Sequence, residues 1–209
     1  LACSEATGDP DHLAFARSLG RRIVADFHDA ETGALYLTPA DATDLAVRPQ
    51  DLSDQSTPSS AGVAVETLLA LAHFSPDDAF ATAADRAIDT YRSQVRSNPL
   101  QHASLALAAD RRERGFLELT VVADALPADW RAHIGRRYLP DRLLSVRPPD
   151  IGPWLGALDL DETPPIWAGR GADDDTPAIY ACRNRTCSAP LTSVEDALDW
   201  ASARGAGRT

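Results

Sequence analysis

Two acidic residues beside an apolar segment are the first candidates for chemistry in this sequence. Asp54 lies in the polar turn DLSDQSTPSS, and Glu66 is the one acid inside the nearly all-apolar run AGVAVETLLALAHF that follows. A carboxyl group at the mouth of a cavity can transfer protons, and a buried acid without a basic partner has a raised pKa. The sequence therefore predicts catalytic roles for Asp54 and Glu66.

The same turn offers groups that could bind a substrate. Ser59 and Ser60 supply hydroxyls beside Asp54, and Arg48 supplies a cation shortly before it. A structural interpretation stands beside this one, because Asp and Ser side chains also satisfy the free N–H groups of a helix N-terminus. The acid inside the helix has a structural alternative too, namely an ion pair with an arginine such as Arg48 or Arg92.

Cys182 and Cys187 are the third candidate pair, in the segment CRNRTC. If the residues on either side form a hairpin, the two sulfurs are close enough to bond. The spacing differs from C-x-x-C, and no second cysteine pair or nearby His completes a tetrahedral zinc site. A redox pair is one prediction for these cysteines. Two reduced thiols, the usual state in a cytoplasm, are the other.

No metal or cofactor signature is present. The five histidines are scattered, and none belongs to an i, i+4 pair or to an H-E-x-x-H motif. The sequence also lacks a Gly-rich phosphate loop and a G-x-S-x-G elbow. We therefore expect no metal and no cofactor. His102, just inside a predicted helix, is the one histidine that remains a candidate.

The elements that must position these residues are helical in the first half of the chain. Apolar spacing and capping residues predict helices over 9–28 and 58–74, a third helix capped by Ser75, and a fourth that begins at Asn98 and stops at Gly115. Short links between consecutive helices favour antiparallel helical hairpins. We expect residues 1–115 to form this helical portion, with Asp54 and Ser59 at a cavity rim and Glu66 buried.

The pattern changes at Phe116. The run FLELTVVAD reads as a buried strand, 127–138 as a helix and RLLSV as a second strand, which together make a βαβ-like unit. A long irregular connection over 147–177 leads to a third strand, TPAIYAC, and the helix SVEDALDWASAR follows the CRNRTC hairpin. Residues 116–209 are therefore predicted to form a small α/β C-terminal subdomain.

Three segments, taken in order, resemble a known family. They are FHDAETGALYLT, LAVRPQDLSDQSTPSSAGVAVETLLALA and AIYACRNRTCSAPLTSVEDAL, and they resemble the C-terminal part of the thioredoxin-domain-containing proteins of the spermatogenesis-associated type. The resemblance implies a mainly α fold, with the helical hairpins of an α/α toroid like that of six-hairpin glycosidases and acylglucosamine 2-epimerases. It also implies a thioredoxin-like domain elsewhere in the full-length protein as a partner.

Composition narrows the range of partners. The net charge is -11, and all 20 basic residues are Arg. Because nucleic acids and anionic membranes are polyanions, we expect neither as a partner. The acidic, Lys-free composition favours a halophilic, cytoplasmic protein, with a GC-rich genome as the alternative cause. The start at Leu1 and the absence of Met favour a fragment of a longer chain.

Three functions remain open from the sequence, and whether the chain is an enzyme is left undecided. The first is carbohydrate binding or processing by the toroid, with a small sugar as ligand and Asp54 and Glu66 as the two carboxylates. The second is a non-catalytic accessory domain of a thioredoxin-like redox protein, with Cys182 and Cys187 as an exchange pair. The third is a structural remnant that is stable only with a missing half.

Overall fold

The computed structural model of the chain describes residues 1–42, 45–171 and 176–205. The chain divides into two compact units. The sheet unit comprises Leu1–Ala14 and Arg114–Thr209, and the helical unit comprises Phe15–Glu113.

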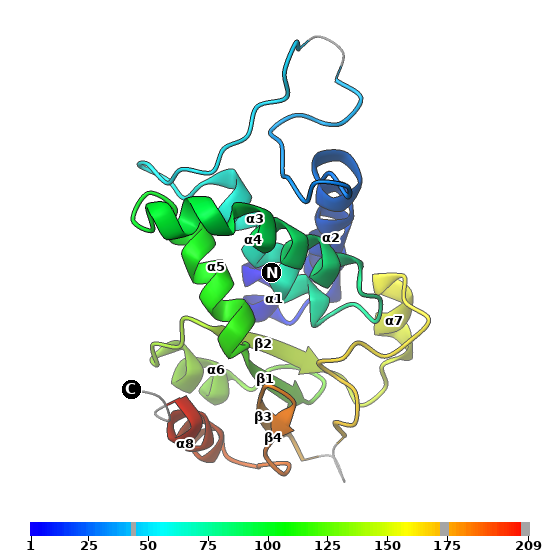
Figure 1. Ribbon diagram of the computed structural model, residues 1–209. Helices are drawn as coiled ribbons and strands as arrows, with labels where there is room; N and C mark the ends of the chain where they lie inside the picture. Colours follow the sequence, from blue (N-terminus) through cyan, green and yellow to red (C-terminus); the bar gives the residue numbers. More distant parts are fainter. Residues whose placement is uncertain (43–44, 172–175, 206–209) are drawn as a thin grey trace. The chain divides into compact units, whose positions relative to one another are not determined.

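The helical unit contains the predicted helices (Figure 1). They are α2 (Pro10–Arg22), which continues into the π-helix η1 (Ile23–Phe27), then α3 (Ser60–Ala72), α4 (Ala79–Ser97) and α5 (Ala103–Arg114). The helix α4 begins later than predicted because the Ser75 hydroxyl accepts a hydrogen bond from Arg17 instead of capping a helix. The helix α5 also begins late, since Gln101 N donates to the carbonyl of Asn98 in a separate turn.

The helix α3 is the packing centre of the helical unit. Its residues Val65, Leu68 and Leu71 have no exposed surface. On one side, α2 and α4 approach it so closely that a Cβ on Gly20 would lie 3.1 Å from a ring carbon of Phe80 and overlap Leu71. The helix is not enclosed on every side, since Val63 is 50% exposed.

The sheet unit is built on a four-stranded mixed sheet with the order β2-β1-β3-β4. Its elements are α1 (Ala2–Thr7), β1 (Leu117–Val122), α6 (Ala128–Gly135), β2 (Arg142–Arg147), α7 (Gly152–Leu158), β3 (Ala178–Arg183), β4 (Thr186–Cys187) and α8 (Val194–Gly205). The strands β1 and β2 are parallel and joined through α6, as the predicted βαβ unit requires. The strand β3 pairs antiparallel with the other side of β1.

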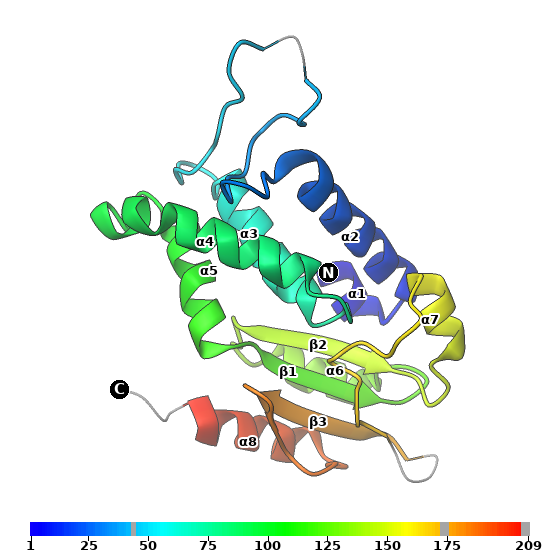
Figure 2. The ribbon, with the colours of Figure 1, turned by 45° about the vertical axis from the view of Figure 1, so that its right-hand side comes forward.

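The two faces of this sheet differ in chemistry. Alternate residues of β1, such as Leu119 and Val121, pack with α6 and α8 in an apolar core, and both helices lie on that side in Figure 2. The residues between them, Glu118 and Thr120, face the other side with Cys182, because Glu118 pairs directly with Cys182 across the ladder. A segment around Ile166 covers this second, polar face, where Thr120 Oγ1 donates to the Ile166 carbonyl at 3.0 Å.

The predicted fold class, a mainly α chain of antiparallel hairpins from an α/α toroid, is wrong. The structure is a mixed α/β fold in which a four-stranded mixed sheet accompanies the helices. The helical periodicity of the first half is real, but the sheet unit begins at the N-terminus, where Glu5 of α1 accepts a hydrogen bond from the Leu144 amide of β2. Local periodicity does not reveal such a contact between residues 139 positions apart.

None of the helices within the described residues combines the length and apolar character that a membrane crossing demands.

Candidate functional site

The hairpin of β3 and β4 holds the two predicted redox cysteines. Arg183 pairs with Thr186, which leaves Asn184 and Arg185 as a two-residue turn. Both turn residues have positive φ, 50° and 63°, as a type I′ turn requires. The side chain of Asn184 donates to the Arg114 carbonyl at 2.9 Å and fixes the turn to the start of β1.

Cys182 and Cys187 face each other across this hairpin and are joined by a disulfide. Their Cα atoms are 4.1 Å apart. Because Arg183 and Thr186 form the hydrogen-bonded pair that closes the turn, the next pair, Cys182 and Cys187, is a non-hydrogen-bonded pair. Side chains of such pairs lie closest together, so the strand register itself brings the sulfurs into bonding range.

The two sulfurs lie in different surroundings. Cys182 is 1% exposed, whereas Cys187 lies on the solvent-exposed outer strand. An incoming thiolate therefore reaches Cys187 more easily than Cys182. Access of this kind is one of the factors that decide which sulfur of a disulfide is attacked.

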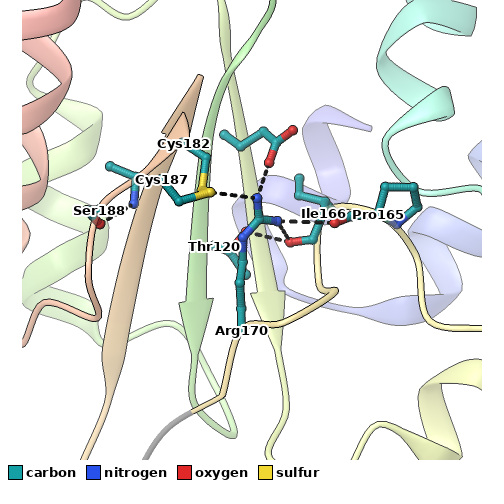
Figure 3. Close-up of a disulfide and its surroundings, with 9 residues drawn as sticks. Thr120, Pro165, Ile166, Arg170, Cys182, Cys187 and Ser188 are labelled. Carbon is teal, nitrogen blue, oxygen red and sulfur yellow. Dashed lines mark hydrogen bonds and ion pairs between the residues drawn. A yellow bond between two sulfur atoms is a disulfide. The ribbon is translucent and has the colours of Figure 1, made fainter. Parts of the chain in front are cut away.

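A buried arginine lies against the sulfur of Cys187. Arg170 is 9% exposed, and its Nη2 donates to Cys187 Sγ at 3.6 Å. The same nitrogen forms an ion pair with Glu118, while Nη1 donates to the Ile166 carbonyl. Figure 3 shows the guanidinium between the disulfide and Ile166. The contacts hold the cation in place, and a fixed cation beside a sulfur stabilises negative charge on it.

Sequence reasoning missed Arg170 and Glu118. The one local signal was the glycine on either side of Arg170, of which Gly169 has a φ of +69°. Glu118 resembled an interruption in a buried strand, and its position opposite Cys182 depends on pairing between strands that are far apart in sequence.

Asp54 caps two helices. Its Oδ1 accepts hydrogen bonds from Ser59 N at 2.7 Å and from the Ser104 hydroxyl, and its Oδ2 accepts from Ser104 N at 2.6 Å. Burial alone would raise the pKa of Asp54, but the hydrogen bonds from Ser104 and Ser59 outweigh it and lower the pKa to about 2. The carboxylate is thus held ionised by groups at the N-termini of α3 and α5.

Glu66 is not buried as predicted, since its side chain is 43% exposed. It forms an ion pair with Arg111 of α5, and neither predicted partner, Arg48 or Arg92, is involved. The side of α3 that carries Glu66 is thus partly open to solvent, although the helix is otherwise mostly apolar. The catalytic roles of Asp54 and Glu66 stay predictions.

Of the three predicted substrate-binding residues, Ser60 lines an apolar pocket of about 430 Å³ within the helical unit, and Ser59 and Arg48 are not among its lining residues. Ser60 lines this pocket, together with apolar residues of η1, α3 and the segment 35–37. Ser59 instead caps α3 by accepting from Gly62 N at 3.2 Å. Arg48 donates to the Thr38 carbonyl at 2.7 Å. Neither predicted catalytic carboxylate is among the residues that line the pocket.

His102 also has a structural contact, because its Nδ1 lies 2.7 Å from the Leu52 carbonyl. Within the described ranges, no three His, Cys, Asp or Glu side chains are grouped as a metal ion would require.

Comparison of the chain with models of known families and with curated proteins finds no match.

Proposed function

We propose that Cys182 and Cys187 form a reversible thiol–disulfide exchange centre, with Cys187 as the sulfur that reacts with other thiols. The observation that carries the proposal is the placement of the Arg170 guanidinium 3.6 Å from Cys187 Sγ, the sulfur of the more exposed cysteine residue. In thiol–disulfide exchange the negative charge passes from the attacking sulfur to the leaving sulfur, and Cys187 lies between the two. A fixed cation beside Cys187 lies next to both of these sulfurs and stabilises the charge that passes between them.

The reaction is an attack of a thiolate on Cys187 Sγ. A bond forms between the incoming sulfur and Cys187, the Cys182–Cys187 bond breaks, and Cys182 leaves as a thiolate that takes a proton from solvent. In the reverse direction, Cys182 attacks the mixed disulfide and releases the thiol. Its position directly opposite Cys187 in the ladder favours this intramolecular step.

The disulfide between Cys182 and Cys187 closes only a short loop, which also supports a chemical rather than a purely structural role for this bond. The two cysteines are five positions apart. A loop this short constrains the unfolded chain little, and the chain-entropy model assigns it a stabilisation of about 2 kcal/mol, at the low end for disulfides. The hairpin is in addition held by Asn184 and by an ion pair between Arg183 and Asp141.

The proposal is tested by the rate at which a small thiol such as 2-mercaptoethanol opens the disulfide. Because Arg170 forms an ion pair with Glu118, the double variant Arg170→Gln/Glu118→Gln is used, which removes both charges of the pair. We expect its rate constant to fall about tenfold, equivalent to about 1.4 kcal/mol of transition-state stabilisation.

A matched control removes the other ion pair of the hairpin. Arg183 is adjacent to Cys182, pairs with Asp141 at 2.6 Å and donates to the Gly115 carbonyl at 3.0 Å. The variant Arg183→Gln/Asp141→Asn should therefore react at the original rate. Equal rates for the two double variants would contradict the proposal, as would a disulfide that no thiol opens in the folded protein.

A further inference from the structure

We infer that the outer edge of β4 binds an extended, cysteine-containing polypeptide segment as an added antiparallel strand, with the substrate cysteine opposite Cys187. This inference rests on the proposed exchange function and names its substrate class. Three observations carry it, namely the direction of the Cys187 backbone groups, the contrast between the two sheet edges, and the distance between opposed residues in a ladder.

The register of the hairpin turns the backbone of Cys187 outward. Thr186 pairs with Arg183 at the turn, and two residues further Ser188 N donates to the Ala181 carbonyl at 2.9 Å. Cys187 lies between these two hydrogen-bonded positions. In an antiparallel ladder, the N–H and C=O of such a residue point away from the neighbouring strand. Both groups of Cys187 therefore face the side of β4 opposite β3.

The two edges of the sheet differ in whether other parts of the chain cover them. At the β2 edge, Leu144 N donates to Glu5 Oε1 at 3.1 Å, and Glu5 also pairs with Arg142 at 3.5 Å, so α1 covers that edge. At the β4 edge, no hydrogen bond recorded among the described residues engages the outward amide or carbonyl of Cys187. Native sheets commonly cover their edges, and an edge left open is a template for an incoming strand.

The added strand would bring a second sulfur to the correct distance. A residue that exchanges both backbone hydrogen bonds with Cys187 has its Cα about 5.5 Å away, with its side chain on the same face of the sheet. Disulfides most often join Cα atoms about 5.5–6 Å apart. The existing bond runs from β3 to β4, so a sulfur that approaches Cys187 opposite Cys182 arrives from beyond this edge.

The open edge of β4 is short. The strand is only two residues long, Thr186–Cys187. Thr186 is bonded towards β3, so Cys187 is the residue of β4 at which an extended segment can form a close pair of backbone hydrogen bonds. Three residues further along the chain, Pro190 has no N–H to offer an incoming strand. A parallel segment would not serve, because its residues bond between positions and would not lie directly opposite Cys187.

The first test measures the rate of disulfide opening by the peptide acetyl-Thr-Val-Cys-Val-Thr-amide in a Cys3→Ser background, since Cys3 is an exposed free thiol. Two variants of the peptide are matched controls. In the first, the Cys amide nitrogen is methylated, which removes an N–H that would face Cys187. In the second, the nitrogen of the following Val is methylated, and this N–H would point away from β4. Each rate is divided by the rate at which the same peptide opens a small-molecule disulfide, which corrects for differences in the reactivity of the peptide thiols.

We expect the unmodified and Val-methylated peptides to react at least tenfold faster than 2-mercaptoethanol at equal thiolate concentration. The Cys-methylated peptide should react no faster than 2-mercaptoethanol. The strand inference is wrong if the two methylated peptides react at equal rates, or if no peptide reacts faster than 2-mercaptoethanol. In either case the proposed exchange function still stands, provided that 2-mercaptoethanol opens the disulfide. If 2-mercaptoethanol also fails to open the disulfide, both the proposed function and this inference are wrong.

The second test uses the trapped adduct. In the variant Cys3→Ser/Cys182→Ser, Cys187 is the remaining cysteine and forms a stable mixed disulfide with the peptide or with 2-mercaptoethanol. We expect hydrogen exchange at the Cys187 amide to be at least tenfold slower in the peptide adduct than in the 2-mercaptoethanol adduct. Equal exchange in the two adducts overturns the inference, and protection that appears without any peptide assigns the edge to a second copy of this chain instead.

Discussion

The double cap formed by Asp54 leads to a prediction about acid stability. The hydrogen bonds from Ser59 and Ser104 lower the pKa of Asp54 from 3.8 to about 2, even though burial opposes this shift. A carboxyl group whose pKa is depressed in the folded state stabilises the fold above its unfolded pKa. That contribution is lost as the pH falls from about 4 towards 2.

The size of the effect follows from the shift. At about 1.4 kcal/mol per pKa unit, the two values correspond to at most about 2.5 kcal/mol. Because Asp54 is partly exposed, solvent screening reduces this to about 1–2 kcal/mol. In the variant Asp54→Asn, the amide cannot accept both Ser104 N and Ser59 N as the carboxylate does, so this contribution is absent.

The assay is the free energy of unfolding from urea titrations between pH 7 and pH 2, at constant salt, for the unmodified protein and Asp54→Asn. We expect the unmodified protein to be more stable by about 1–2 kcal/mol at pH 7, and the difference to shrink below pH 4. Asp51→Asn is the control, since Asp51 accepts a single backbone hydrogen bond, from Ser60 N at 2.9 Å. A difference between Asp54→Asn and the unmodified protein that is constant from pH 7 to pH 2 would refute the capping account.

Three further predictions concern packing and charge. Gly62→Ala places a Cβ 2.5 Å from Ser104 Cβ and should lower the free energy of unfolding by about 1–3 kcal/mol, whereas Gly156→Ala, with open space around it, should be neutral or stabilising in the same denaturant titration. Burial raises the pKa of Glu5 against the opposing effects of the Leu144 amide and Arg142. Stability should therefore fall as the pH rises through the folded pKa of Glu5, and Glu5→Gln should remove that fall, as thermal melts at pH 4 and pH 7 would reveal. Glu66→Gln should lower the free energy of unfolding by less than about 1 kcal/mol, since the Glu66 side chain is 43% exposed. A larger decrease in the same denaturant titration would contradict this estimate for the ion pair with Arg111.

Local structure was largely predictable from the sequence, because it depends on nearby residues. Apolar spacing placed the helices of the first half and the βαβ unit. The hairpin that joins the cysteines also followed from the residues flanking CRNRTC. In each case the physical cause lies within about ten residues of the element.

The predictions that failed needed long-range pairing. The toroid prediction gave most weight to the helices of the first half. In the structure, Glu5 accepts a hydrogen bond from the distant Leu144 amide, and the N-terminus belongs to the sheet unit. Glu66 was expected to be buried because its helix is apolar, yet the side of α3 that carries it is partly open. Arg170 became a candidate only once β1 and β3 were paired, since that pairing brings Glu118 beside the disulfide.

The family resemblance, a carbohydrate ligand, the thioredoxin-like partner and a cytoplasmic location stay predictions. The apolar lining of the pocket near Ser60 gives no support to a sugar, whose hydroxyls need several polar partners. The cysteine pair is the candidate site with the most specific chemistry, because a buried cation contacts the sulfur of Cys187.

The redox equilibrium of the Cys182–Cys187 pair is the most direct test of the central claim. The protein with Cys3→Ser is equilibrated in thiol and disulfide buffers of defined potential, and the oxidised fraction is measured by alkylation and mass spectrometry. An exchange centre with Arg170 beside its sulfur should have a midpoint above about -270 mV, and Arg170→Gln/Glu118→Gln should move it to a more negative potential. A midpoint below about -300 mV that the double variant leaves unchanged would identify a structural disulfide and contradict the proposed function.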